Sequence, residues 1–333
     1  MKRRHKQLLG IVVSVVVVAV IAYLAAPTVM KLRMPPETQP ALAPPEAPPA
    51  GLAEEKPAAE VAAPAESAGA EAAQKAFQHG TELLAARKLI EARGELSAAL
   101  FSGSLDDQQA RQARNALEDL ADITIFSSRI FEGDPYTFQY TVARGELLKD
   151  VERYKQLHVP PSIILKINGL RSAESIRAGQ TLKFIQGPFH AVISNSRFTM
   201  DIYLQRSGLE KVYVKRLRVG LGKDGSTPTG AWKVALGRKM RNATWYPPPN
   251  SGVTLALQPG DKDYPLGKDG YWIGLEGTDP NTAGFRGYGI HGTNDPNSIG
   301  RAESLGCIRL ADPDIDLVFS LLYEEWSTVR VEP

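Results

Sequence analysis

The stretch His291–Leu310 reads HGTNDPNSIGRAESLGCIRL and contains Cys307, the one cysteine of the 333-residue chain, sixteen positions after a histidine. A thiol becomes a strong nucleophile near neutral pH when a base takes its proton or its surroundings lower its pKa, and His291 is the natural base. Gly292 and Gly306 stand beside the two residues, and glycine lets backbone N–H groups approach a substrate closely. An oxyanion hole requires such donors, so the stretch is a candidate site for a cysteine nucleophile. The alternative is a buried cysteine that acts as a small hydrophobic residue.

The residues around the thiol and the histidine form two blocks in a fixed order. His-Gly-Thr at 291–293 and Ser-Leu-Gly-Cys-Ile-Arg at 304–309 resemble the active-site signature of the L,D-transpeptidase catalytic domain, the YkuD family. Thr-Pro-Thr-Gly at 227–230, after a Val-Gly-Leu-Gly strand end, extends the resemblance to about residues 189–333. Leu305 is a departure, because many family members have histidine there.

The resemblance implies a chemical role for each residue of the signature. Cys307 would attack the carbonyl between the third residue of a peptidoglycan stem peptide and the terminal D-alanine, while His291 takes and returns the proton. The carbonyl of Gly292 would orient the imidazole, and the N–H groups of Gly306 and Cys307 would hold the oxyanion. Ser304 would donate a hydrogen bond within the site. An amine of a second stem would then resolve the thioester into a cross-link.

Three further residues are predicted to bind substrate. Arg309 belongs to the family's signature and would grip a stem carboxylate, because guanidinium pairs well with carboxylate; an internal structural pairing is the alternative. Tyr288 and Trp272 would line the cleft, although aromatic residues on strands are often core residues. Asp295 and Glu303 also lie in the motif, where an exposed loop is expected for both.

Other reaction classes fit the sequence less well. In papain-like peptidases the cysteine precedes its histidine, whereas no histidine follows Cys307 here; His190 is a distant fallback base. One cysteine and one nearby histidine leave a zinc site short of ligands, and neither a metal nor a cofactor is predicted. Two alternatives remain open: an L,D-carboxypeptidase with water as acceptor, and a catalytically inactive wall-binding scaffold. The sequence gives neither the acceptor nor the diamino acid of the stem.

The N-terminus carries a targeting signal. Residues 1–7 are basic, and residues 8–26 are nineteen residues without charge, long enough to cross a bilayer as a helix. We predict a cytoplasmic tail at 1–7 and a transmembrane helix at 8–30, with the catalytic domain in the periplasm or another extracytoplasmic wall space; a cleaved signal peptide is the alternative. The net charge of +2 does not imply a nucleic-acid partner.

Residues 31–69 are rich in Pro, Ala and Glu and predict an extended linker. Residues 70–128 carry apolar residues at helical spacing and resemble a tetratricopeptide-like repeat, either a plain helical hairpin or a module with a protein partner. Ser104 and Asp107 predict a capping box for its last helix, through Leu120.

Residues 136–186 predict a small βααβ unit that resembles the LysM glycan-binding module. Tyr-Thr-Val at 140–142, Asn-Gly-Leu at 168–170 and Gly-Gln-Thr-Leu at 179–182 carry the resemblance. The family usually has Asp-Thr where Glu146 and Leu147 stand, at a loop associated with sugar contact. A degenerate spacer module is therefore the alternative to a peptidoglycan-binding one.

The rest of the chain predicts strands and turns, with a long irregular excursion at 242–264. Asp312 is expected to cap a last helix that begins at Pro313. The predicted fold class is thus multidomain: a transmembrane helix, a helical tetratricopeptide-like segment, a βααβ LysM-like module, and a mostly-β L,D-transpeptidase catalytic domain.

Overall fold

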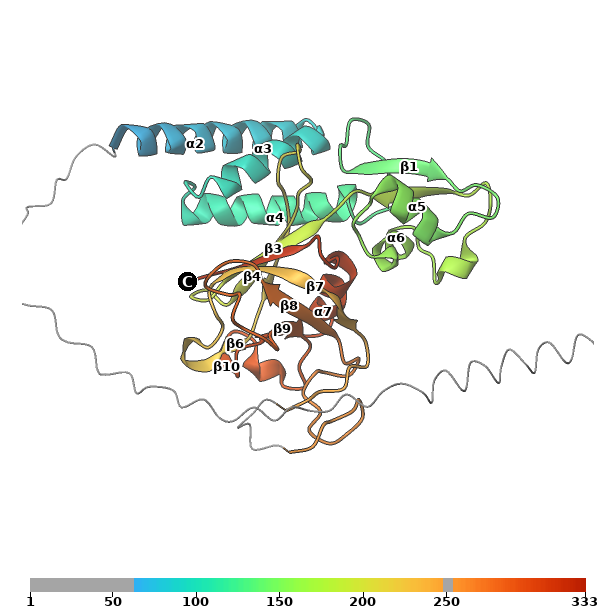
Figure 1. Cartoon of the computed structure of the whole chain (residues 1–333). Coiled ribbons are helices and arrows are strands. Elements are labelled where there is room, and N and C mark those ends of the chain that lie inside the picture. Colours follow the sequence, from blue (N-terminus) through green and yellow to red (C-terminus); the bar gives the residue numbers. More distant parts are fainter. Residues whose placement is uncertain (1–62, 248–253) are drawn as a thin grey trace, which may run out of the picture. The chain divides into compact units, whose positions relative to one another are not determined.

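The computed structural model describes residues 63–247 and 254–333 (Figure 1). The predicted transmembrane helix, and the linker up to residue 62, lie outside the described residues. Within the part that is described, no helix is both long enough and apolar enough to cross a membrane.

Three helices open the described chain: α2 (Ala63–Ala85), α3 (Leu89–Phe101) and α4 (Asp107–Thr124). α2 begins seven residues before the expected start at residue 70, inside the stretch assigned to the linker. Packing is sequential, α2 against α3 and α3 against α4. The helices bury Leu96, Leu117 and Leu120 together with Tyr213, which lies in the C-terminal part of the chain. They therefore complete their core on that part and do not form a hairpin that stands alone.

The start of α4 differs from the expected capping box. Asp106 is the N-cap residue, and its carboxylate accepts the Gln109 N–H at 2.8 Å. An N-cap side chain must stand directly before the first helical residue to reach the free N–H groups of the first turn. Ser104 is two residues too early, and its N–H donates instead to the Ser102 hydroxyl at 3.1 Å. The helix also runs four residues past the expected end.

The predicted βααβ order is present. It comprises β1 (Thr137–Thr141), α5 (Leu148–Lys155), α6 (Pro161–Ile167), a 3₁₀ turn η1 (Ala173–Ser175) and β2 (Thr181–Ile185). β1 and β2 pair antiparallel, with Tyr140 opposite Leu182. Asn168, at the end of α6, donates from its amide nitrogen to the carbonyls of Ile164 and Lys183, both at 2.8 Å. This side chain ties the second helix to the second strand.

An eight-stranded sheet forms the remainder, in the order β11-β9-β8-β7-β12-β3-β4-β5. Neighbours are antiparallel except for the pairs β11–β9 and β12–β3, which are parallel. β6 (Leu221–Gly222) and β10 (Ala302–Ser304) form a separate parallel pair. The bounds of the sheet strands are β3 Phe189–Ser194, β4 Thr199–Leu204, β5 Val212–Arg218, β7 Gly230–Met240, β8 Trp272–Gly277, β9 Gly289–His291, β11 Ile308–Arg309 and β12 Thr328–Glu332.

The sheet curls so that its two ends approach each other. β5 and β11 are the first and last strands of the order, yet Gly220, two residues after β5, exchanges two backbone hydrogen bonds with Arg309 of β11, at 2.9 and 2.8 Å. A Cβ on Gly220 would lie 2.6 Å from the Ser298 carbonyl oxygen, so this close approach requires glycine. The closure brings the segment 220–230 against the block that contains the cysteine.

α7 (Asp314–Leu321) packs Ile315, Val318 and Leu321 into the core. The predicted start of this helix was wrong. Pro313 is the N-cap residue, it has no side-chain acceptor, and no side chain caps the helix. Asp312 therefore stands one position too early to act as the N-cap. Two short 3₁₀ turns, η2 (Lys223–Gly225) and η3 (Pro296–Ser298), flank the cysteine block.

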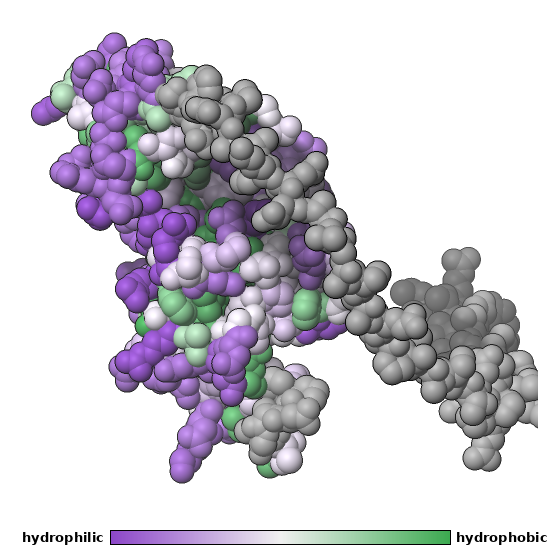
Figure 2. Space-filling view, turned by 90° about the vertical axis from the view of Figure 1, so that its left-hand side faces the viewer, coloured by the Kyte–Doolittle hydropathy of each residue, from purple (hydrophilic) through white to green (hydrophobic). Residues whose placement is uncertain are grey.

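In the excursion after β7, residues 242–247 and 254–264 form no helix or strand, and Trp245 and Leu257 exchange two backbone hydrogen bonds of 2.9 Å. On the face shown in Figure 2, hydrophilic residues dominate, and hydrophobic ones appear in separate patches between them.

Candidate active site

The parallel pair of β9 and β11 brings the two blocks of the motif together. Ile308 lies opposite Ile290, and Arg309 lies opposite His291. Both isoleucines are buried in the core. Since side chains alternate along a strand, His291 and Arg309 point to the other face. Cys307 directly precedes β11, and its thiol contacts the backbone of Gly287 and Gly289, just before His291 in the chain. A histidine and a cysteine sixteen positions apart are thus brought to two adjacent, paired segments.

The imidazole of His291 is buried and held by one backbone group. Its Nδ1 lies 2.5 Å from the carbonyl oxygen of Gly292. A carbonyl can only accept, so Nδ1 carries the hydrogen, and Nε2 of the neutral ring is left to accept a proton. Burial, with a smaller contribution from the Arg309 charge, lowers the pKa of His291 to about 4, against the opposing hydrogen bond to Gly292. The ring is therefore a neutral base at neutral pH.

The thiol of Cys307 is half-buried, and its Sγ lies 3.8 Å from the carbonyl oxygen of Gly287. Burial raises its pKa to about 11, although a hydrogen bond from the Gly289 N–H and the charge of Arg309 both act to lower it. At neutral pH the thiol and the imidazole are therefore both uncharged. Activation of the nucleophile requires proton transfer during attack.

Ser304 organises the turn before the nucleophile. Its hydroxyl is buried, donates to the Cys307 carbonyl at 2.6 Å and accepts the Gly306 N–H at 3.0 Å. The Gly306 N–H is thus already occupied, and of the two donors expected to hold an oxyanion, only the Cys307 N–H remains. Gly306 has φ +127°, and a Cβ there would lie 2.7 Å from the Tyr288 ring, so only glycine fits this turn.

Thr227 is a supporting residue that the sequence analysis did not assign to the site. Its buried hydroxyl donates to the Gly306 carbonyl at 3.0 Å and accepts the Gly222 N–H at 2.8 Å. It therefore ties the turn before the nucleophile to the segment that closes the sheet. The signal was present in the Thr-Pro-Thr-Gly loop, but sequence alone did not show which hydroxyl reaches the cysteine block.

The three predicted substrate-binding residues occupy different positions around the thiol. Trp272 stacks on the His291 ring, with centroids 5.7 Å apart and planes at 14°, so it covers the base. Tyr288 packs between Gly306 and Trp232. Arg309 is half-buried, and no carboxylate among residues 68–247 and 254–333 lies within 4 Å of its guanidinium. Asp295 and Glu303 are both exposed.

A groove of about 600 Å³ lies beside the thiol. It shares Trp272, Gly287 and Tyr288 with the site just described. The carbonyl oxygen of Gly287 lies 3.8 Å from the thiol sulfur, so the groove adjoins the residues that surround Cys307. The remaining lining residues are Ala235, Arg238, Gly274, Leu275, Glu276, Phe285 and Arg286.

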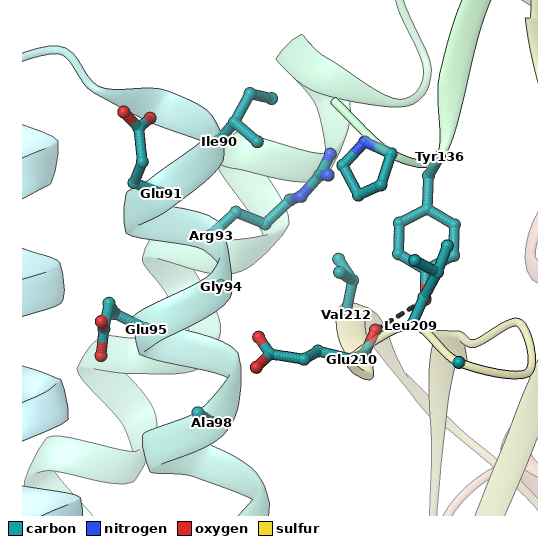
Figure 3. Close-up of a pocket in the computed structure, with 12 residues that line it drawn as sticks. Ile90, Glu91, Arg93, Gly94, Glu95, Ala98, Tyr136, Leu209, Glu210 and Val212 are labelled. Carbon is teal, nitrogen blue, oxygen red and sulfur yellow. Dashed lines mark hydrogen bonds between the residues drawn. The ribbon is translucent and has the colours of Figure 1, made fainter. Parts of the chain in front are cut away.

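A second hollow, of about 480 Å³, lies between α3 and the loop 208–212 (Figure 3). Figure 3 shows Glu91 and Glu95 on α3 and Glu210 on the facing loop, where the Tyr136 hydroxyl donates to the Glu210 carbonyl at 2.6 Å. None of the motif's residues lines it. It is therefore separate from the thiol site, and the predicted protein partner of the helical region stays a prediction.

A thiol and a neutral imidazole on paired, adjacent segments of a curled β-sheet, next to an open groove, are a cysteine–histidine arrangement of the kind used in acyl transfer. Residues 188–331 match the model of the L,D-transpeptidase catalytic domain, the YkuD family. The chain therefore carries a YkuD-family L,D-transpeptidase catalytic domain, which confirms the resemblance predicted for this part.

Similar proteins point to the same domain. The probable L,D-transpeptidase ErfK/SrfK of Salmonella typhimurium is 34% identical over 128 residues, which are 36% of this chain and 37% of the relative. YkuD of Bacillus licheniformis is 29% identical over 184 residues, 53% of this chain and 88% of the relative. The chain thus spans well under half of the Salmonella relative, and the similarity concerns the catalytic domain.

A solved L,D-transpeptidase from Mycobacterium smegmatis has 15% identity and a TM-score of 0.31, and the likeness covers 46% of this chain and 64% of that one. This global similarity is too low to support a conclusion about the chain. The family match at 188–331 does not extend to residues 136–186, so the LysM resemblance remains a prediction.

Proposed function

We propose that this protein is a peptidoglycan L,D-transpeptidase that uses Cys307 as nucleophile and His291 as general base. The observation that carries the proposal is the hydrogen bond from His291 Nδ1 to the Gly292 carbonyl. It fixes the tautomer whose Nε2 accepts a proton, on the strand that pairs with the segment directly after the thiol. The family match of residues 188–331 supports the substrate class.

The reaction proceeds in two acyl transfers. The Cys307 sulfur attacks the carbonyl carbon after the third stem residue, and the thiol proton passes to His291 Nε2. The oxyanion is held by the Cys307 N–H, since Ser304 occupies the Gly306 N–H. The intermediate collapses when the leaving amine of D-alanine takes the proton from His291, which leaves a thioester. An acceptor amine then attacks the thioester, loses a proton to His291, and the thiol is restored.

The substrate's carboxylates fit the charge of the site. Arg309 faces the catalytic side of the sheet without a carboxylate partner among the described residues, so its guanidinium is available to a stem carboxylate. Tyr288 forms one wall of the groove, while Trp272 both lines the groove and covers the base.

The test is acylation of the thiol. Residues 63–333 are incubated with a carbapenem, a drug class that characteristically acylates L,D-transpeptidases, and with a stem tetrapeptide, alongside Cys307→Ala. We expect a covalent adduct on Cys307 by mass spectrometry and none in the variant. An intact protein with no adduct from either compound would refute the proposal and favour the inactive scaffold.

Product analysis separates the acceptors. Cross-linked dimers from tetrapeptides indicate an amine acceptor and a transpeptidase. Tripeptides alone indicate water as acceptor, and therefore the L,D-carboxypeptidase. A protein lysine as acceptor would appear as tripeptide attached to that protein.

We also propose that residues 136–186 bind glycan strands and that the chain is anchored in a membrane with its catalytic domain outside the cytoplasm. Glu146, at the departure from the LysM pattern, accepts hydrogen bonds from the hydroxyls of Tyr140 and Tyr154, and Leu147 beside it is 54% exposed. An exposed leucine at the sugar-contact loop gives a direct test. Retention of Cys307→Ala protein on purified peptidoglycan should fall with Leu147→Glu. Equal retention of both would refute glycan binding through this loop.

A further inference from the structure

Arg238 occupies an irregular part of β7 beside the catalytic groove. The register between β7 and β8 shifts between Val234 and Lys239, and Gly237 in that segment has φ +66°. Arg238 crosses directly above Gly274 of β8, where a Cβ would lie 2.7 Å from the Arg238 Cβ. Because Gly274 has no Cβ, the Arg238 side chain can pack against the backbone of β8 and line the groove.

The guanidinium of Arg238 has no compensating charge. It is exposed, and no carboxylate among the described residues lies within 4 Å of it. Glu276, the one carboxylate in the groove's lining, is engaged by Lys233 at 3.6 Å. Arg286, the second arginine of the lining, donates from one Nη to the carbonyls of Ala283 and Phe285, which occupies that nitrogen but leaves the positive charge.

The groove therefore carries a net positive charge, and two of its lining residues, Gly287 and Tyr288, lie next to the cysteine block: the Gly287 carbonyl is 3.8 Å from the thiol sulfur. Arg309 adds a further unpaired positive charge on the same side of the sheet. Such a surface attracts an anionic ligand, and a planar guanidinium pairs well with a carboxylate through two parallel hydrogen bonds. A stem peptide that retains free carboxylates, some of them distant from the scissile bond, has the complementary charge.

We propose that Arg238 is a specificity-determining residue that recognises a free carboxylate of the stem peptide, so that stems amidated at that carboxylate bind less well. The inference rests on the proposed function, because it takes the stem peptide as ligand. Arg309 lies opposite His291, whereas Arg238 lines the groove and Arg309 does not, so the two arginines would engage different parts of one peptide.

Binding is measured first, since it does not depend on turnover. The Cys307→Ala protein, with Arg238 intact or changed to Gln, is titrated by calorimetry with two synthetic tetrapeptides that differ only by amidation of one carboxylate; each free carboxylate is amidated in turn. With Arg238, we expect one amidation to weaken binding by roughly tenfold. With Arg238→Gln, that difference should shrink to about twofold or less. Arg330→Gln, on the exposed side of β12 where Arg330 pairs with Glu332, is the matched control for loss of one positive charge.

A failure of the Arg238 proposal can be told apart from a failure of the proposed function. If Arg238→Gln preserves the full preference for every carboxylate, or if no tetrapeptide binds, the inference is overturned. Turnover by the protein with Cys307 intact then reports on the proposed function alone: a chain that processes free and amidated tetrapeptides equally is a transpeptidase without this specificity. Arg238→Lys retains the charge but loses the planar fork, and we expect it to restore part of the preference.

Discussion

Arg309 lies directly opposite His291 in the parallel pair of β11 and β9. Burial is the main cause of the low pKa of His291, and the positive charge of Arg309 lowers it further because it disfavours the imidazolium. The same charge favours the thiolate of Cys307 and so opposes the burial that raises the pKa of the thiol. One guanidinium thus adds to the effect of burial on the base and makes the nucleophile easier to ionise.

Replacement of Arg309 by Gln should change the pKa of both the His291 imidazole and the Cys307 thiol. Without the charge, the pKa of the Cys307 thiol should rise above about 11, and alkylation by iodoacetamide at pH 9 should slow severalfold. Arg309→Lys should behave nearly as the natural protein in this assay, because the charge is retained. Rates are followed by mass spectrometry across pH 8–11. Identical profiles for the Gln and Lys variants would show that the charge does not act on the thiol.

The resting thiol should be unreactive toward small alkylating agents at neutral pH. A pKa of about 11 against the ordinary 9.0 means about a hundredfold less thiolate at pH 7. Acylation by a substrate should nevertheless be fast, because His291 takes the proton during attack. His291→Gln should therefore lower the acylation rate by about 10²–10⁴ and leave alkylation at pH 11 nearly unchanged. Equal losses in both reactions would indicate that the histidine supports the fold of the site and does not act as the base.

Because of His291, the free energy of unfolding should decrease as the pH is lowered. Its pKa of about 4 in the folded chain lies below the ordinary 6.5, so the unfolded chain binds more protons between these values. The free energy of unfolding therefore decreases as the pH falls below 6.5, and the decrease levels off below about 4. The total decrease is on the order of 3 kcal/mol. Urea unfolding of the natural protein and of His291→Gln at pH 7 and 4.5 measures it. Between pH 7 and pH 4.5 the natural protein should lose more free energy of unfolding than the variant does. An equal loss in both proteins would exclude the effect.

Local patterns in the sequence were sufficient for most elements of the fold. The apolar spacing at 70–128 and the Asn-Gly-Leu sequence after α6 each depend on neighbours a few residues away, and the structure has helices there. Errors fell at helix starts. Asp106 and Pro313 occupy the N-cap positions of α4 and α7, and a shift of one or two residues cannot be resolved when several capping residues stand in a row.

The site was less predictable, because its supports come from distant segments. The motif drew attention to His291 and Cys307 by residue type alone. The contact of Thr227 with Gly306 spans 79 residues, and it depends on the closure at Gly220 that no local pattern reveals. Trp272 was expected in the cleft, but its stacking on His291 follows from the pairing of β8 with β9. Arg238 emerges from a register shift in β7, and such irregularities carry no reliable sequence signature.

The Thr227 hydroxyl should be needed to hold the turn before the nucleophile. Thr227→Val keeps the shape of the side chain but leaves the Gly222 N–H without its acceptor, so we expect a loss of about 1–3 kcal/mol in the free energy of unfolding. Thr227→Ser keeps both hydrogen bonds and should recover most of this. Acylation of Cys307 should slow in the Val variant, because Gly306 is no longer fixed. Full activity and stability in the Val variant would remove Thr227 from the site's support.

The buried pair of Arg93 and Asp134 should anchor the helices to the βααβ unit. Arg93 of α3 is 1% exposed, and its Nη2 donates to Asp134 Oδ1 at 2.7 Å. Asp134 also accepts the Tyr136 N–H at 3.0 Å and the Thr137 hydroxyl at 2.8 Å, at the start of β1. Asp134→Asn leaves the guanidinium buried without its counter-charge, and we expect a loss of about 3–5 kcal/mol.

The double variant Arg93→Met, Asp134→Asn distinguishes this pair from a general packing effect. Removal of both charges should restore much of the stability, because no buried charge then lacks a partner. Hydrogen exchange in α2 and α3 should accelerate in Asp134→Asn and return toward the natural rate in the double variant, since these helices depend on the pair for their attachment. If the double variant loses as much free energy of unfolding as Arg93→Met and Asp134→Asn lose together, the two residues stabilise the chain independently. The helices are then held by the apolar contact of Leu96 and Leu120 with Tyr213.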